Sequence, residues 1–194
     1  MNLKKEKNGR SVSDVVNRKA FHDSFERATI SKNVYESAYK AIASILEIAD
    51  GKDNEYMEGF DARTGELIVN NTGRDAAFGT WTAFNGAEMA EVMGHSENRI
   101  VLMHNHPNST SPSFQDLITA STNIVHGSFV VGHDGSIWYL ESNENAASSL
   151  MIAKEDFKSL DYEEEFARAK AVEYAIKIQK RIPGFVWRRV DGQA

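Results

Sequence analysis

Residues 101–117 read VLMHNHPNSTSPSFQDL, and the chain is organised around this stretch. A nearly continuous apolar run over residues 99–103 predicts a short strand that is covered on both faces. Two histidines, His104 and His106, follow it, and we expect them at the carboxyl end of that strand. A polar loop with two prolines then leads to a helix expected over residues 113–124. Open sheets commonly place ligand sites in this position, at the end of a strand and in its following loop.

The two histidines are separated by one residue, so in an extended backbone both side chains leave the same face. Two imidazoles on one face can share a metal ion. Asp116 follows His106 by ten residues, and a loop of that size can bring its carboxylate back to a third ligand position. Two histidines and one carboxylate around a tetrahedral ion leave one position for water, as in an open catalytic zinc site. Zinc lowers the pKa of bound water from about 15.7 to about 7.

A second interpretation of the same residues needs no metal. Histidine pairs with this spacing also occur on protein surfaces by chance. Ser113 can be the N-cap of the following helix, and Asp116 can complement the helix dipole in its first turn. This interpretation leaves the histidines and the loop unexplained. The four other histidines fall on expected helices or turns, and we interpret them as surface or capping residues: His22, His95, His126 and His133.

Strand and helix patterns extend on both sides of the central stretch. The other expected strands are residues 55–61, 66–70, 78–84, 128–132 and 136–140, of which the last two form a hairpin around an Asp-Gly turn. The other expected helices are residues 11–25, 31–50, 85–93 and 161–182, and residues 143–152 are ambiguous. Helices flanking a mixed set of strands predict an α/β (α+β) fold.

Two of these helices have clear apolar faces. The face expected for residues 31–50 is Val34, Tyr35, Ala38, Ile42, Ile45, Leu46 and Ala49. The stripe expected for residues 161–182 is Phe166, Ala169, Val172, Ala175, Ile176 and Ile182. Both patterns predict helices that bury one side against a sheet or another helix.

The length of 194 residues favours one globular unit with its own core. We divide it into a flexible N-terminus (1–10), N-terminal helices (11–50), a metal-binding core (51–160) and a C-terminal helix and tail (161–194). The chain has no cysteine, which excludes disulfides and thiol catalysis, and no apolar run long enough to span a bilayer. We therefore expect a soluble, cytoplasmic protein. A net charge of −6 disfavours sequence-independent nucleic-acid binding.

The central residues resemble a known family. His104-Asn105-His106-Pro107, a short polar loop and Ser113-x-x-Asp116 are similar to the HxHP and SxxD motif of the JAMM (JAB/MPN+) metalloproteases. The HNHP form is similar to the RadC-like and the phage or mobile-element branches. The resemblance covers roughly residues 55–140. One difference is that six residues, rather than the more usual seven, separate His106 from Ser113.

The resemblance implies a JAB/MPN-like mixed sheet flanked by helices, similar to the cytidine-deaminase-like architecture, with extra N-terminal and C-terminal helices. It implies that His104, His106 and Asp116 bind Zn²⁺ and that Ser113 stabilises the oxyanion. In that family a glutamate on an upstream strand is the general base. We place this role at Glu55, at the start of the strand expected over residues 55–61, and keep Glu58 in reserve.

The leading hypothesis is a zinc-dependent metallopeptidase or isopeptidase that hydrolyses an amide bond through a zinc-activated water. Its substrate would be a protein or peptide, with ubiquitin-like proteins and phage or mobile-element proteins as candidates. One alternative is a non-catalytic JAB/MPN-like module for protein interaction. A further alternative is a RadC-like role in association with DNA, which the acidic charge disfavours. The oligomeric state stays open.

Overall fold

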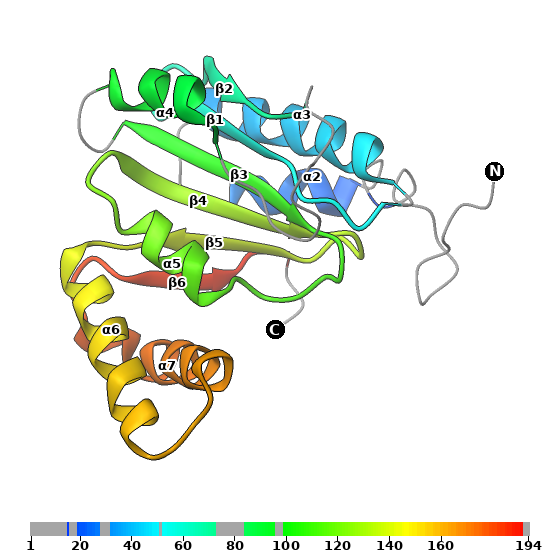
Figure 1. The fold of residues 1–194 in the computed structure, drawn as a ribbon. Coiled ribbons are helices and arrows are strands. Elements are labelled where there is room, and N and C mark those ends of the chain that lie inside the picture. The colour runs from blue at the N-terminus through cyan, green and yellow to red at the C-terminus, as the bar shows by residue number, and fades with distance from the viewer. Residues whose placement is uncertain are drawn as a thin grey trace.

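A computed structural model describes residues 15, 19–27, 32–50, 52–72, 84–95 and 99–191. Its centre is a six-stranded mixed sheet with the strand order β2-β1-β3-β4-β5-β6, and helices flank it (Figure 1). The expected α/β character is therefore confirmed. The segment 1–10 and, apart from Phe84, the strand expected over 78–84 lie outside the described residues.

Among the strands that the structure describes, only one neighbouring pair runs parallel. The strands are β1 (Met57–Asp61), β2 (Leu67–Asn70), β3 (Ile100–His106), β4 (Val125–Gly132), β5 (Ile137–Glu141) and β6 (Val186–Arg189). β3 and β4 are the parallel pair, and every other pair is antiparallel. Parallel neighbours need a crossover connection, and here the helix α5 (Phe114–Ala120) provides it.

Helices cover the two faces of the sheet unequally. The helices α2 (Lys19–Glu26) and α3 (Lys32–Ala49) pack on one face against side chains such as Phe129 and Tyr139. α5 and the hairpin of α6 (Glu144–Ser159) and α7 (Glu164–Ile178) pack on the other face against Trp138 and Leu140. A shorter helix, α4 (Gly86–Met93), lies beside β2, and a 3₁₀ turn (Gln179–Arg181) follows α7. The core therefore has two layers, one on each side of the strands.

The apolar face predicted for α3 is confirmed, except that Tyr35 is only partly buried. The fully buried side chains of this helix are Val34, Ala38, Ile42, Ile45, Leu46 and Ala49. Their three- and four-residue spacing places them on one side of the helix, where they pack on the sheet. The hairpin predicted between β4 and β5 is also present, and Gly135 in its turn has a φ of 89°. Glycine adopts this left-handed conformation at little cost because it has no Cβ.

The stripe predicted for α7 was partly wrong. Phe166 is 47% exposed and Ala169 is exposed, whereas Ala167, Ala171, Val172 and Ala175 are buried. The small alanines let α6 approach closely, so the contact face is rotated away from Phe166, which stacks on Tyr162 with ring centroids 5.0 Å apart. The ambiguous residues 143–152 belong to α6, with Asn143 as its N-cap.

The turn between β1 and β2 is fixed by a buried carboxylate. Asp61 accepts hydrogen bonds from the backbone N–H groups of Arg63 and Thr64 and forms an ion pair with Arg99, next to β3. Burial alone would raise the pKa of Asp61, but these hydrogen bonds and the guanidinium charge outweigh it and hold the pKa well below its usual range. The carboxylate therefore stays ionised and ties the hairpin to the start of β3.

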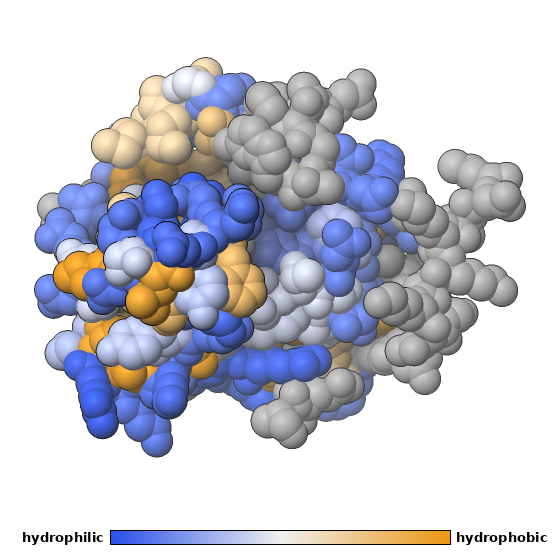
Figure 2. Space-filling model, turned by 60° about the horizontal axis from the view of Figure 1, so that its bottom comes forward, coloured by the Kyte–Doolittle hydropathy of each residue, from blue (hydrophilic) through white to orange (hydrophobic). Residues whose placement is uncertain are grey.

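The α6–α7 hairpin lies on the same side of the sheet as α5 (Figure 1). On the face of the molecule that Figure 2 shows, hydrophobic residues appear among hydrophilic ones. The exposed large apolar side chains of this hairpin include Met151, Ile152, Leu160, Phe166 and Tyr174. In the described ranges, no helix is both long and apolar enough to cross a membrane.

Candidate metal centre

Strand β3 carries both histidines on one face of the sheet. Alternation along the strand places Ile100, Leu102, His104 and His106 on one side and Val101, Met103 and Asn105 on the other. The expectation that the strand ends before the histidines was wrong. It continues to His106, because His104 and His106 pair with Val130 and Gly132 of the parallel strand β4.

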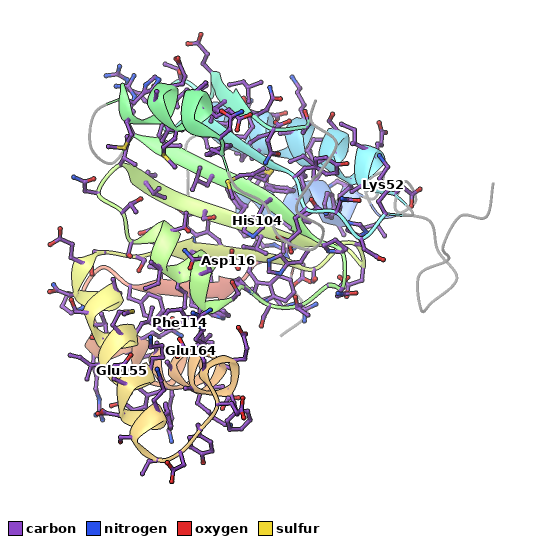
Figure 3. The ribbon with its side chains drawn as sticks, viewed as in Figure 1. Lys52, His104, Phe114, Asp116, Glu155 and Glu164 are labelled. Atoms are coloured by element: carbon purple, nitrogen blue, oxygen red, sulfur yellow. The ribbon has the colours of Figure 1, made fainter. Side chains whose placement is uncertain are left out.

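The start of α5 brings a carboxylate opposite the histidines. Ser113 is the N-cap, its Oγ accepts a hydrogen bond from the Asp116 N–H at 3.2 Å, and the Ser113 N–H donates to Asp116 Oδ2 at 2.6 Å. This capping box is the metal-free role predicted for the two residues. Asp116 also faces His104 across the space between α5 and β3 (Figure 3). The two interpretations are therefore compatible, because the cap orients the same carboxylate toward the imidazoles.

The three side chains aim their ligand atoms at one point. His104 Nε2 lies 3.1 Å from His106 Nε2 and 3.1 Å from Asp116 Oδ1, and His106 Nε2 lies 3.4 Å from Asp116 Oδ2. Two ligands that are each about 2.0–2.1 Å from a tetrahedral zinc ion are separated by roughly 3.3–3.4 Å. All three ligand atoms lie within 4.8 Å of one another. The triad therefore fits one small ion with nitrogen and oxygen ligands.

The orientation of His106 is set by its other ring nitrogen. His106 Nδ1 lies 2.9 Å from the backbone oxygen of Thr110, and a carbonyl can only accept, so Nδ1 carries the proton. The lone pair of Nε2 is then directed at the cluster. A hydrogen bond of this kind to a backbone carbonyl is the usual support of a metal-binding histidine.

Electrostatics in the cluster favour a positive charge. Burial would raise the pKa of Asp116, but His104 and His106 outweigh it and hold the pKa well below its ordinary value. Burial would lower the pKa of His106, but the charges of Asp116 and Glu55 outweigh it and raise the pKa. An ionised carboxylate beside basic imidazoles in a largely buried pocket attracts a cation, whether that cation is a proton or a metal ion.

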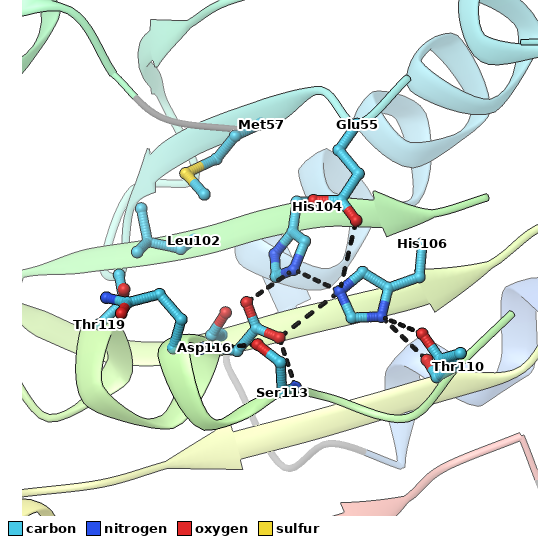
Figure 4. A pocket seen from close by; sticks show the side chains of 11 residues that line it. Glu55, Met57, Leu102, His104, His106, Thr110, Ser113, Asp116 and Thr119 are labelled. Carbon is cyan, nitrogen blue, oxygen red and sulfur yellow. Dashed lines mark hydrogen bonds and ion pairs between the residues drawn. The ribbon is translucent and has the colours of Figure 1, made fainter. Parts of the chain in front are cut away.

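The structure places the two candidate glutamates differently. Glu55 precedes β1, which begins at Met57 rather than at the expected residue 55. Its Oε1 lies 3.9 Å from His106 Nε2, so the carboxylate stands at the edge of the triad (Figure 4). Glu58 is buried inside β1, and alternation directs it to the face opposite Met57, which lines the pocket of the triad. The structure therefore brings Glu55 to the cluster and does not bring Glu58.

The cluster opens into a cavity of about 250 Å³. The triad and Glu55 line this cavity. The other lining residues are Thr110, Ser113, Gln115, Thr119, Met57, Leu102 and Ser128. Ser113 is exposed at its mouth, and its Oγ accepts from the backbone, so its own proton can be donated to a bound group. The lining thus combines the apolar side chains of Met57 and Leu102 with several hydroxyl groups and the triad.

Two residues near the site were missed or misread from the sequence. Asn105 has 0% exposure and no role had been assigned to it, and His133 is buried at 9% exposure although a surface position was expected. The two side chains contact each other, with Asn105 Nδ2 2.9 Å from His133 Nε2. Burial lowers the pKa of His133. The signal was the alternation with the two histidines, which directs Asn105 to the opposite face, where Val101 and Met103 are buried and an amide requires hydrogen-bond partners.

Comparisons with protein-family models, curated proteins and solved structures gave no match. The resemblance to JAMM metalloproteases therefore rests on the motif itself. What the geometry adds is that the residues of the motif converge on one point, together with a glutamate that is distant in the sequence.

Proposed function

We propose that this protein is a zinc-dependent metallopeptidase or isopeptidase of the JAMM type, with a JAB/MPN-like fold. The proposal is carried by one observation: Glu55 lies beside a His-His-Asp triad that is spaced for a tetrahedral ion and borders a cavity. A triad alone would fit a structural or adventitious ion. An adjacent carboxylate that is not part of the triad is what water activation requires.

His104, His106 and Asp116 would hold the ion, which in such a site acidifies a water and polarises a carbonyl. The Glu55 carboxylate accepts a proton from the attacking water and returns it to the leaving amine, because its Oε1 lies 3.9 Å from His106 Nε2. The Ser113 hydroxyl donates a hydrogen bond to the carbonyl oxygen as negative charge develops there. Thr110 keeps His106 in the tautomer that presents Nε2.

The proposed substrate is a protein or peptide, because the cavity beside the triad is lined by hydroxyl groups that can bond a backbone amide and by Met57 and Leu102, which can contact an uncharged side chain. The cysteine-free chain fits a reducing compartment, and we place the activity in the cytoplasm.

The test combines metal analysis with hydrolysis of peptide and isopeptide-linked substrates by the full chain. The purified protein should carry about one zinc per chain and lose turnover on chelation. His104→Ala and Asp116→Ala should lose the metal, whereas Glu55→Gln should retain it and lose turnover. Full activity of a folded, metal-free protein would refute the proposal.

The same experiment separates the catalytic role from a binding module. A zinc-loaded protein that is inert toward every peptide and isopeptide bond would favour the non-catalytic JAB/MPN-like module. Salt-sensitive binding to DNA would favour the RadC-like alternative, since affinity from phosphate contacts falls steeply with salt.

A further inference from the structure

Asn105 lies between the two histidines in β3, and its side chain leaves the strand on the face of the sheet opposite to theirs. It is fully buried, at 0% exposure, on the same face of β3 as the buried apolar residues Val101 and Met103. A buried primary amide is costly unless its donors and its acceptor are all engaged. The partners of this amide therefore indicate what it is for.

Those partners flank the proposed general base. Asn105 Oδ1 accepts from the Tyr56 N–H at 2.8 Å, and Asn105 Nδ2 donates to the Asn54 carbonyl oxygen at 3.0 Å. Both are backbone groups with only one possible polarity, so they fix which end of the amide is oxygen and which is nitrogen. One side chain thus bonds the residue before Glu55 and the residue after it.

The sheet itself does not hold this segment. In the pairing between β1 and β3 the first pair is Met57 with His104, so residues 54–56 lie beyond the backbone ladder. The side-chain amide of Asn105 supplies the hydrogen bonds that backbone groups of β3 would supply if the pairing continued. Asn105 belongs to β3, the strand that carries both histidines. Its hydrogen bonds therefore fix the position of Glu55 relative to the proposed ligands.

His133 completes the arrangement from the turn between β4 and β5. Its Nε2 lies 2.9 Å from Asn105 Nδ2, which is a donor, so Nε2 accepts and Nδ1 carries the proton. The second N–H of the amide is thereby engaged, and rotation of the amide would cost two backbone hydrogen bonds as well. Strands β3 and β4 and the segment before β1 meet at this one group.

We propose that Asn105 is a positioning residue that holds Glu55 beside the metal centre, with His133 fixing the orientation of its amide. This inference rests on the proposed function for its catalytic part. Its structural part is independent: the Tyr56 N–H should exchange with solvent as slowly as an amide of the β1–β3 ladder, because its acceptor is buried.

The test uses Asn105→Leu, which keeps the number of side-chain heavy atoms and the branch at Cγ and removes all three hydrogen bonds. The matched control is Met103→Leu, since Met103 is also fully buried on the same face of β3 and the exchange conserves volume. We expect Asn105→Leu to keep zinc, to lose roughly 10- to 100-fold in kcat with KM changed by less than about threefold, and to speed exchange of the Tyr56 amide. Met103→Leu should change none of these.

A double-mutant cycle separates positioning from a general loss of structure. If Asn105 acts through Glu55, adding Asn105→Leu to Glu55→Gln should reduce the residual turnover by less than about twofold, whereas a general defect would multiply the two losses. Multiplied losses, or a zinc-loaded Asn105→Leu protein with kcat within twofold of the parent, would overturn the inference.

Two outcomes distinguish this inference from the proposed function. If the parent protein hydrolyses no amide, the proposed function fails, and the exchange measurements still test the bracing of residues 54–56. If Asn105→Leu does not fold, hydrogen exchange of the Tyr56 amide in the parent protein still tests whether Asn105 braces residues 54–56. Rapid exchange of the Tyr56 amide there would show that the brace does not exist.

Discussion

Replacing Glu58 by glutamine tests whether this residue is a buried, protonated carboxyl of the core rather than a part of the site. Glu58 is 7% exposed and pairs in the sheet with Met103 and Asn70. Burial raises the pKa of Glu58 from its ordinary 4.5 to about 7. The folded protein therefore prefers the protonated form, and glutamine reproduces that form in shape and hydrogen bonding without the charge.

The size and sign of the effect follow from linkage. The folded pKa lies above the unfolded one, so wild-type stability falls as the pH rises from about 4.5 to about 7 and is level above that. One pKa unit corresponds to roughly 1.4 kcal/mol, so the penalty approaches an upper bound of roughly 3 kcal/mol. Between pH 5 and pH 8, Glu58→Gln should gain roughly 2–3 kcal/mol relative to the wild type.

Urea unfolding of both proteins at pH 5, 6, 7 and 8 measures this difference, and the comparison cancels every other titrating group. The variant should also keep its zinc and its turnover, in contrast to Glu55→Gln. A stability difference that does not vary with pH would refute the account of the buried carboxyl. If Glu58→Gln retained zinc and lost turnover, the role of general base would have to be assigned to Glu58 instead of Glu55.

Four further substitutions address the scaffold and the helix caps. Asp61→Asn should cost roughly 2–3 kcal/mol at pH 7 by urea unfolding, and because the folded pKa of Asp61 is lowered, the loss should shrink progressively as the pH falls from about 4 toward that lowered pKa. Gly127→Ala should lower the melting temperature, since its Cβ would lie 2.6 Å from the Tyr139 hydroxyl oxygen. Ser113→Ala should lose about 1 kcal/mol of cap stability and at least tenfold in kcat, whereas Asn85→Ala, which removes the equivalent cap of α4, should lose stability alone.

The features that could be predicted from the sequence have local causes. Asn85 and Ser113 start helices because their side chains accept N–H groups of the first turn, and both helices were expected to begin at these residues. The shared face of His104 and His106 follows from alternation alone. Gly135 marks its turn because few other residues adopt its φ.

The features that could not be predicted depend on residues distant in the chain. The strand β6 is short and rich in arginine, and it forms because its side chains cover β5, with Arg188 over the Tyr139 ring and Arg189 over the Trp138 ring. The contact face of α7 depends on the alanines that meet α6. The choice between Glu55 and Glu58 depends on where the ladder with β3 begins, which no local pattern encodes.

The three residues proposed as ligands lie within thirteen residues of one another, from His104 to Asp116, whereas Glu55 is 49 positions before His104 in the chain. Closing the short loop costs little conformational entropy, so in the proposed enzyme metal retention would depend mainly on the β3–α5 connection. The proposed catalysis would require in addition that β1 dock on β3. Zinc content alone would therefore be a poor measure of the native state, because a variant that folds only locally would bind the ion and still be inactive.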